Sequence, residues 1–232
     1  LLVAGWFVVF SVPFMLWVHE DKSRVSRRGK IVGEAYAQLV RTFKEIRKYR
    51  QTLRFLIAHL IYNDGLVTIF AFGGIYAAAT FGFTLEKVLL FGIVVNVFAG
   101  AGAVAMGYLD HHIGAKRTLS ISLLGLIIAT LLAMAARDEV WLWVAGCMIG
   151  IFAGPNQSAS RSLMGRLVPQ GMRNEFFGFF ALSGKLTAFV GPFMLGLLTQ
   201  LSGSQRVGVT IVIVLFGIGL VLLQGITAEE RE

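Results

Sequence analysis

Long apolar runs, separated by short polar connectors, make up most of this chain. The runs lie at 1–18, 53–79, 86–109, 118–136, 140–165, 176–201 and 206–226. Each is close to the roughly 20 residues that a helix needs to cross the hydrocarbon core of a membrane. Connectors as short as 137–139 and 203–205 make successive helices antiparallel. The pattern predicts an all-α protein, a polytopic membrane helical bundle.

Lysine and arginine gather in alternate connectors. The segment 19–54 holds about half of the 21 lysines and arginines, and further basic residues stand at 116–117, between 161 and 173, and in the C-terminal tail. Because basic loops remain on the cytoplasmic side of a membrane, we expect the 19–52 segment and the C-terminus to be cytoplasmic. The expected location is the cytoplasmic membrane of a bacterium.

Within the basic segment, apolar residues such as Val32, Ala35, Tyr36 and Leu39 recur at steps of one, three and four. This spacing is typical of an amphipathic helix that lies on the inner leaflet. A solvated linker helix packed on cytoplasmic loops is the alternative. The predicted organisation is a transmembrane helix at 1–18, a basic amphipathic segment at 19–52, six helices at 53–226 and a cytoplasmic tail at 227–232.

The composition agrees with a membrane protein and excludes other classes. Hydrophobic residues make up 56% of the chain and charged residues 15%, against roughly 25% charged in soluble domains, and the mean hydropathy is +0.73. The net charge of +8 resides in the connectors, so no nucleic-acid partner is expected. His111 and His112, as neighbours on a helix, point about 100° apart and cannot chelate together. We expect no metal, no cofactor and no enzymatic activity.

The string GAGAVA at 100–105 matches a dinucleotide-binding fingerprint, but it has no preceding strand, no following amphipathic helix and no acidic residue about 20 positions later. A packing role explains it better, since small residues let membrane helices approach closely. The predicted packing face comprises Gly92, Asn96, Gly100, Ala103 and Gly107.

Polar residues interrupt two of the predicted spans. His59, Tyr62, Asn63 and Asp64 fall within 53–79, and Lys185 falls within 176–201. Ionisable groups inside a membrane are costly and commonly mark a transport pathway. We therefore expect Asp64 and Lys185 to pair and, together or through Asp64 alone, to bind a substrate or a coupling proton. The alternative is a buried pair that only fixes the register of two helices.

A third polar group follows Pro155, which removes a backbone donor and favours a kink. This group comprises Asn156, Gln157, Ser158 and Ser160, and Arg161 lies one helical turn beyond Gln157 on the same face. These side chains either contact a substrate or hold helices together. In the next run, Pro192 predicts a second bend.

Three stretches give the chain a family resemblance: YNDG at 62–65, GPNQSASRSLMGRLVP at 154–169 and EFFGFF at 175–180. Together they resemble the unidentified-major-facilitator family, which includes the autophagy-related vacuolar amino-acid effluxer. The resemblance covers essentially the whole chain and implies the six-helix C-terminal half of a major facilitator fold, with 1–18 as the one preceding helix. It also implies secondary transport by alternating access, with amino acids as the substrate class known for the vacuolar member.

GYLDHHIGAKRT at 107–118 falls where this superfamily carries G-x-L-x-D-R-x-G-R-K, in the cytoplasmic loop between the second and third helices of a half. Gly107, Leu109, Gly114 and Lys116 match the motif, whereas His111 and His112 replace its acidic and basic residues. The resemblance implies a cytoplasmic gate whose ordinary lock is altered.

Asp110 stands one position before the motif's acidic residue. We hypothesise that it takes over the lock by accepting hydrogen bonds from Arg161 or from the helix N-terminus near Asn174 and Phe176. The predicted gate residues are Gly107, Asp110, His111, His112, Gly114, Lys116 and Arg161.

These observations favour secondary active transport of a small solute, with this chain supplying one half of the transporter. The expected partners are the solute, a coupling proton, the lipid bilayer, and either a missing N-terminal half or a second copy of the chain. The competing class is a non-transporting membrane binding or scaffold module that acts through its basic amphipathic segment. The predicted substrate and proton pathway comprises Asp64, Asn63, Tyr62, His59, Asn96, Asn156, Gln157 and Lys185.

Overall fold

The computed structural model describes residues 9, 11–12, 49–168 and 172–227. Contacts divide the chain into two compact units, Leu1–Phe43 and Lys44–Glu232, and the helices described below all belong to the second. The predicted amphipathic segment and nearly all of the first predicted span lie outside the described residues. Val9, Ser11 and Val12 of that span are helical.

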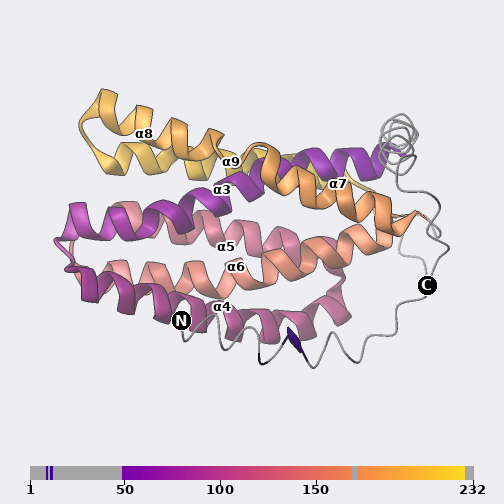
Figure 1. Ribbon diagram of the computed structural model, residues 1–232, viewed down its shortest axis with the longest axis horizontal. Coiled ribbons are helices and arrows are strands. Elements are labelled where there is room, and N and C mark those ends of the chain that lie inside the picture. The colour runs from indigo at the N-terminus through magenta and orange to yellow at the C-terminus, as the bar shows by residue number, and fades with distance from the viewer. Residues whose placement is uncertain (1–8, 10, 13–48, 169–171, 228–232) are drawn as a thin grey trace. The chain divides into compact units, whose positions relative to one another are not determined.

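The second unit is a bundle of α-helices, and the described residues contain no strand. Its helices run back and forth along one common direction (Figure 1), as the short connectors predict. They are α3 (Arg50–Phe81), α4 (Leu85–Ile113), α5 (Ala115–Ala135), α6 (Glu139–Leu167), α7 (Arg173–Leu186), α8 (Val190–Ser202) and α9 (Gln205–Gln224). The predicted all-α membrane helical bundle is confirmed.

Five helical segments in the described part of the chain are long and apolar enough to cross a membrane. They are α3, α4, α5, α9 and the combined segment Arg173–Ser202 that contains α7 and α8. α6 has 29 residues but is not among them, and its second half carries the polar group that follows Pro155. It packs chiefly between α4 and α5, so neighbouring helices cover much of it.

Glycines set the approach of α4 to α6, on a face other than the predicted one. A Cβ atom at Gly102 of α4 would stand 2.1 Å from Ile151 O, and one at Gly154 of α6 would stand 2.0 Å from Ala99 O. By contrast, Gly92, Gly100 and Gly107 of the predicted face have open space where a Cβ would be. Within the described residues, the predicted packing face is therefore wrong at these three glycines, whereas Ala103 of that face does meet α6, since a Cβ at Gly154 would stand 3.2 Å from Ala103 Cβ. α4 is rotated so that its Val95–Ala99–Gly102 side meets α6.

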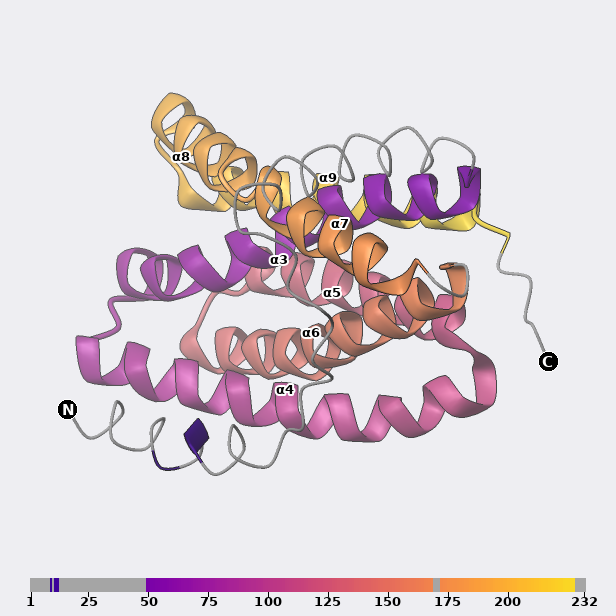
Figure 2. The same ribbon diagram turned by 45° about the vertical axis from the view of Figure 1, so that its right-hand side comes forward.

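A break separates α7 from α8 within one membrane-length segment. Residues 187–189 leave the helix, and Val190 N donates to Thr187 O at 2.8 Å. Pro192 stands in the first turn of α8, where a missing N–H removes no helical hydrogen bond. The proline thus favours a helix that begins afresh just before it, and α8 follows α7 as a second segment beside α9 (Figure 2).

Cations from α3 and α5 meet the end of α9. Lys116 Nζ donates to Gln224 O at 3.1 Å and to Ile226 O at 2.6 Å. Arg54 Nη1 donates to Gly225 O at 3.2 Å. The last carbonyl groups of a helix lack partners inside the helix and carry partial negative charge, so these cations both satisfy and stabilise the end of α9.

Candidate functional site

Most of the predicted pathway residues come together around one cavity between α3, α6 and α7. Its volume is about 390 Å³, and it lies beside the middle of α3 and the second half of α6. The structure thus brings together residues that are up to 126 positions apart in the sequence. The lining comprises His59, Asn63, Asn156, Gln157, Ser160, Arg161, Phe177, Phe180, Ala181, Gly184 and Lys185.

His59 is fixed in this cavity by α7. Its Nδ1 atom lies 2.9 Å from Ser183 Oγ, and Ser183 Oγ lies 2.8 Å from Phe180 O. Because a carbonyl oxygen only accepts, Ser183 donates to it, and His59 Nδ1 donates to Ser183. The neutral imidazole therefore carries its proton on Nδ1 and keeps Nε2 as an acceptor. The ring also stacks on Phe180, with centroids 4.0 Å apart.

Tyr62 and Asn156 belong to a buried chain of hydrogen bonds that joins three helices. Tyr62 Oη lies 2.8 Å from Ser160 Oγ, and Ser160 donates to the Asn156 carbonyl at 2.5 Å. Asn156 Nδ2 donates to Ser122 Oγ of α5 at 3.1 Å. Both Tyr62 and Asn156 are fully buried, so this network positions the polar half of α6 against α3 and α5.

Arg161 and Lys185 give the cavity two positive charges. Both side chains line it, from α6 and α7 respectively, and no acidic residue is among the lining residues. In the described part of the chain, the recorded salt bridge joins Lys87 to Glu139 and involves neither of them. Arg161 was predicted in the gate, but the structure places it with the pathway residues.

The predicted ion pair between Asp64 and Lys185 is wrong. Asp64 is buried, and its Oδ2 accepts a hydrogen bond of 2.7 Å from Gly191 N in the first turn of α8. Lys185 is exposed and lines the cavity. The break after Leu186 explains the difference, since Lys185 lies in the last turn of α7 and lines the cavity, while Asp64 bonds to the separate helix α8.

Asn63 and Asn96, both predicted in the pathway, have different surroundings. Asn63 lines the polar cavity and donates from Nδ2 to Gly184 O at 2.7 Å. Asn96 is exposed, donates to Gly92 O of its own helix at 2.8 Å, and lines a separate, largely apolar cavity of about 240 Å³. Phe72 lines that second cavity as well.

The predicted gate loop at 107–118 is almost entirely helical. α4 continues to Ile113 and α5 begins at Ala115, so the connector is Gly114 alone. Gly114 has φ +86°, a conformation that side chains disfavour, which explains the glycine at this position. The expectation of a loop is therefore wrong.

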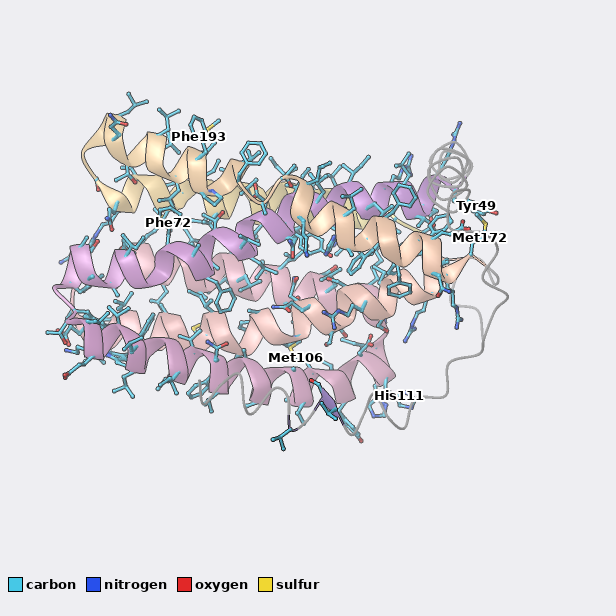
Figure 3. The ribbon with its side chains drawn as sticks, in the orientation of Figure 1. Tyr49, Phe72, Met106, His111, Met172 and Phe193 are labelled. Atoms are coloured by element: carbon cyan, nitrogen blue, oxygen red, sulfur yellow. The ribbon has the colours of Figure 1, made fainter. Side chains whose placement is uncertain are left out.

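The gate side chains lie at the end of α4. Gly107, His111 and His112 are exposed, and His111 points away from the bundle (Figure 3). Asp110 is half-buried, and its Oδ1 has no hydrogen-bond partner among the described residues. Lys116, the remaining gate residue, contacts the end of α9 as described above. The lock at Asp110 stays a prediction.

Sequence reasoning missed Phe177 and Phe180, which form an aromatic wall of the cavity on α7, and Ser183, which holds His59. Ser160, which holds Tyr62, belongs to the predicted polar group after Pro155. Phe177 and Phe180 do fall inside a stretch that carries the family resemblance. Serines and phenylalanines are ordinary residues of membrane helices, so their type alone gives no signal.

The fold and the cavity together define an integral membrane protein with a polar, cationic pocket between its helices. A family model described as "Vacuole effluxer Atg22 like" matches residues 1–231. The chain belongs to this family, which confirms the predicted membership of a major-facilitator-type transporter family.

Individual relatives agree with this membership. The chain is 29% identical over 228 residues to an uncharacterised MFS-type transporter, YxiO, of Bacillus subtilis, with 98% of the chain and 53% of the relative covered. It is 24% identical to autophagy-related protein 22 of Coccidioides immitis (88% and 38% covered). It is 26% identical to autophagy-related protein 22-1 of Aspergillus clavatus (99% and 42% covered). The chain thus spans about half the length, or less, of these relatives.

Proposed function

We propose that this chain forms one half of a secondary transporter and that the cavity between α3, α6 and α7 binds a small solute with a carboxylate group. Amino acids are the proposed substrate class, because the family resemblance includes a vacuolar amino-acid effluxer and the family is described as effluxers. The proposal includes alternating access, a proton as the coupling ion, and no enzymatic step. It places the chain in a bacterial cytoplasmic membrane, with the C-terminus on the cytoplasmic side.

The pairing of Arg161 and Lys185 around one cavity carries this proposal. Two cations that face a common space repel each other, and an anion between them offsets this repulsion by attracting both. A carboxylate can accept hydrogen bonds from both cations. Asn63 and Gln157 add amide groups, and His59 adds an acceptor at Nε2. Phe177 and Phe180 offer an apolar surface to the rest of the solute.

A second half is part of the proposal. The chain covers 53% of its Bacillus relative, and the described residues that line the cavity come from α3, α6 and α7. An N-terminal six-helix half, or a second copy of this chain, would close it. The helices described here would then be the C-terminal half of a major facilitator fold.

Binding of radiolabelled L-leucine to the chain in lipid nanodiscs tests the proposal, with flux into proteoliposomes as the second readout. We expect Arg161→Gln and Lys185→Gln each to weaken binding by about tenfold or more, because a hydrogen bond to a charged group contributes about 1.5–3 kcal/mol. Arg166→Gln is the matched control, since Arg166 is an exposed arginine of α6 outside the cavity lining.

A second comparison isolates the carboxylate. Isoamylamine has the side chain and amine of leucine but lacks its carboxyl group, so we expect it not to compete for the site. Equal competition by leucine and isoamylamine, or unchanged binding in both cation variants, would contradict the proposal.

A further inference from the structure

Asp64 is a buried carboxyl group with only half of its hydrogen bonding complete. Its side chain is 2% exposed, and Oδ2 accepts from Gly191 N. Its other oxygen, Oδ1, is buried and has no hydrogen-bond partner within the part of the chain that the structure describes. Buried polar atoms are nearly always paired, and an unpaired one in a membrane-spanning helix needs an explanation. Asp64 is not among the residues that line the solute cavity, so solute binding does not supply that explanation.

Among the described residues, no ion pair neutralises Asp64. α8 has no ionisable residue, and Arg206, the single ionisable residue of α9, donates to Ala136 O. Lys185 of α7 and Arg161 of α6 line the solute cavity, to which Asp64 does not belong. His59 of α3 is hydrogen-bonded to Ser183. A proton on Oδ1 is therefore the simplest way to compensate the charge of Asp64.

Asp64 also lies at the break between α7 and α8. Three hydrogen bonds join one turn of α3 to the two sides of this break. Asn63 donates to Gly184 O at 2.7 Å, and Thr187 Oγ1 donates to Leu60 O at 3.2 Å, both on the α7 side. The bond from Gly191 N to Asp64 is the one of the three that reaches α8.

The contact of Asp64 with α8 is close-packed. A Cβ atom at Gly191 would stand 2.1 Å from Thr68 Oγ1 and 3.3 Å from Asp64 Cγ. Thr68 Oγ1 in turn donates to the backbone oxygen of Asp64 at 2.7 Å, and this bond holds the Thr68 side chain in place. Glycine at 191 thus allows the first turn of α8 to approach the carboxyl group directly.

We propose that Asp64 is a proton-binding site whose occupancy sets the position of α8 relative to α7. As a carboxylate, Asp64 accepts a charge-assisted hydrogen bond from Gly191 N at the positive end of the α8 dipole. A proton taken up from water forms an O–H bond at Oδ1, removes the charge, and leaves a neutral hydrogen bond of about half the strength. α8 is then free to pivot at residues 187–189.

The role of this proton-dependent movement of α8 in solute transport rests on the proposed transport function. α7 carries one wall of the solute cavity, and α8 continues the same membrane segment beyond the break. Movement at the break would therefore couple a proton to the cavity. The existence of this movement can nevertheless be measured without any solute.

The test uses the full chain in nanodiscs of phosphatidylethanolamine and phosphatidylglycerol. Spin labels are attached at Leu182→Cys on α7 and Leu201→Cys on α8, which are 51% and 76% exposed, with Cys147→Ser to remove the native thiol. Double electron–electron resonance then gives the distance between the two spin labels at each pH across the range over which buried carboxyl groups titrate.

We expect the distance distribution to change with pH in the parent, and to stay at its low-pH form at every pH in Asp64→Asn. Glu86→Gln, which removes an exposed acid of α4, should keep the full response. Asp64→Glu, which restores a carboxyl group, should regain it. A distance that does not depend on pH in the parent, or a response that persists in a folded Asp64→Asn variant, would overturn the proposal.

Solute binding provides an independent readout. A pH-dependent distance in a chain that binds no leucine would leave the proton site standing and remove the proposed transport function. Leucine transport with a label distance that does not depend on pH would support the transport function and overturn the proton site. If Asp64→Asn does not fold, an infrared band of a protonated carboxyl group that shifts in Asp64→Glu supports the site, and a band that does not shift contradicts it.

Discussion

Tyr62 of α3 and Ser160 of α6 are joined by a hydrogen bond of 2.8 Å between their hydroxyl groups. Ser160 donates its own proton to Asn156 O, so Tyr62 is the donor in this bond. The bond links α3, which carries Asp64, to α6, which carries the polar residues that follow Pro155.

Tyr62→Phe should lower the free energy of unfolding by about 1 kcal/mol, because it removes one buried hydrogen bond and leaves the ring in place. Circular dichroism during titration of dodecyl sulfate into mixed micelles measures this change. Tyr49→Phe is the matched control, since the Tyr49 side chain is 37% exposed. Equal effects of the two substitutions would show that the Tyr62 bond does not stabilise the fold.

Gly154→Ala should destabilise the packing of α6 on α4. The added methyl group would stand 2.0 Å from Ala99 O, a backbone atom that moves only with its helix, so we expect a loss of about 1–3 kcal/mol. Gly100→Ala adds the same methyl group to open space and should change stability by less than about 0.5 kcal/mol. The same unfolding titration distinguishes them, and a larger effect at Gly100 would restore the original packing face.

Lys116→Met should loosen the end of α9. The substitution removes two hydrogen bonds to the carbonyls of Gln224 and Ile226 but keeps the apolar stem, and we expect a loss of about 1–2 kcal/mol. Hydrogen exchange of the last turn of α9 should become faster. Arg117→Met, at an exposed neighbour, serves as control and should leave this exchange unchanged.

Gln157→Ala and Asn96→Ala should differ in their effect on leucine binding. Gln157 lines the polar cavity, whereas Asn96 bonds within its own helix beside the apolar cavity. Loss of one hydrogen bond to the solute, about 1 kcal/mol, corresponds to about a fivefold weaker affinity. We expect that loss for Gln157→Ala and no change for Asn96→Ala; weaker binding in Asn96→Ala alone would place the solute elsewhere.

The apolar runs predicted the helices well because the length needed to span a membrane constrains each run strongly. The polar residues of the cavity were also predictable in large part, since His59, Asn63, Asn156 and Gln157 are conspicuous in apolar surroundings. Their type and position therefore carried the information, and the structure places these four around one cavity.

Other features depend on how each helix is rotated about its axis, which neighbouring helices decide. The packing face of α4 turned out to include Gly102 rather than Gly100, a rotation that composition does not reveal. The prediction of an ion pair between Asp64 and Lys185 was wrong for a related reason. The break after Leu186 lets α7 and α8 face different neighbours, and Pro192 predicted a bend without predicting where each side would point.

α6 has a further consequence for how this protein is made. Its polar second half keeps it out of the set of helices that are apolar enough to cross a membrane independently. A helix of this kind partitions poorly into lipid alone, and it gains stability when its polar groups find partners. Asn156 finds one in Ser122 of α5, and Gly154 meets α4. We therefore expect α6 to enter the bilayer together with α4 and α5, which precede it during synthesis.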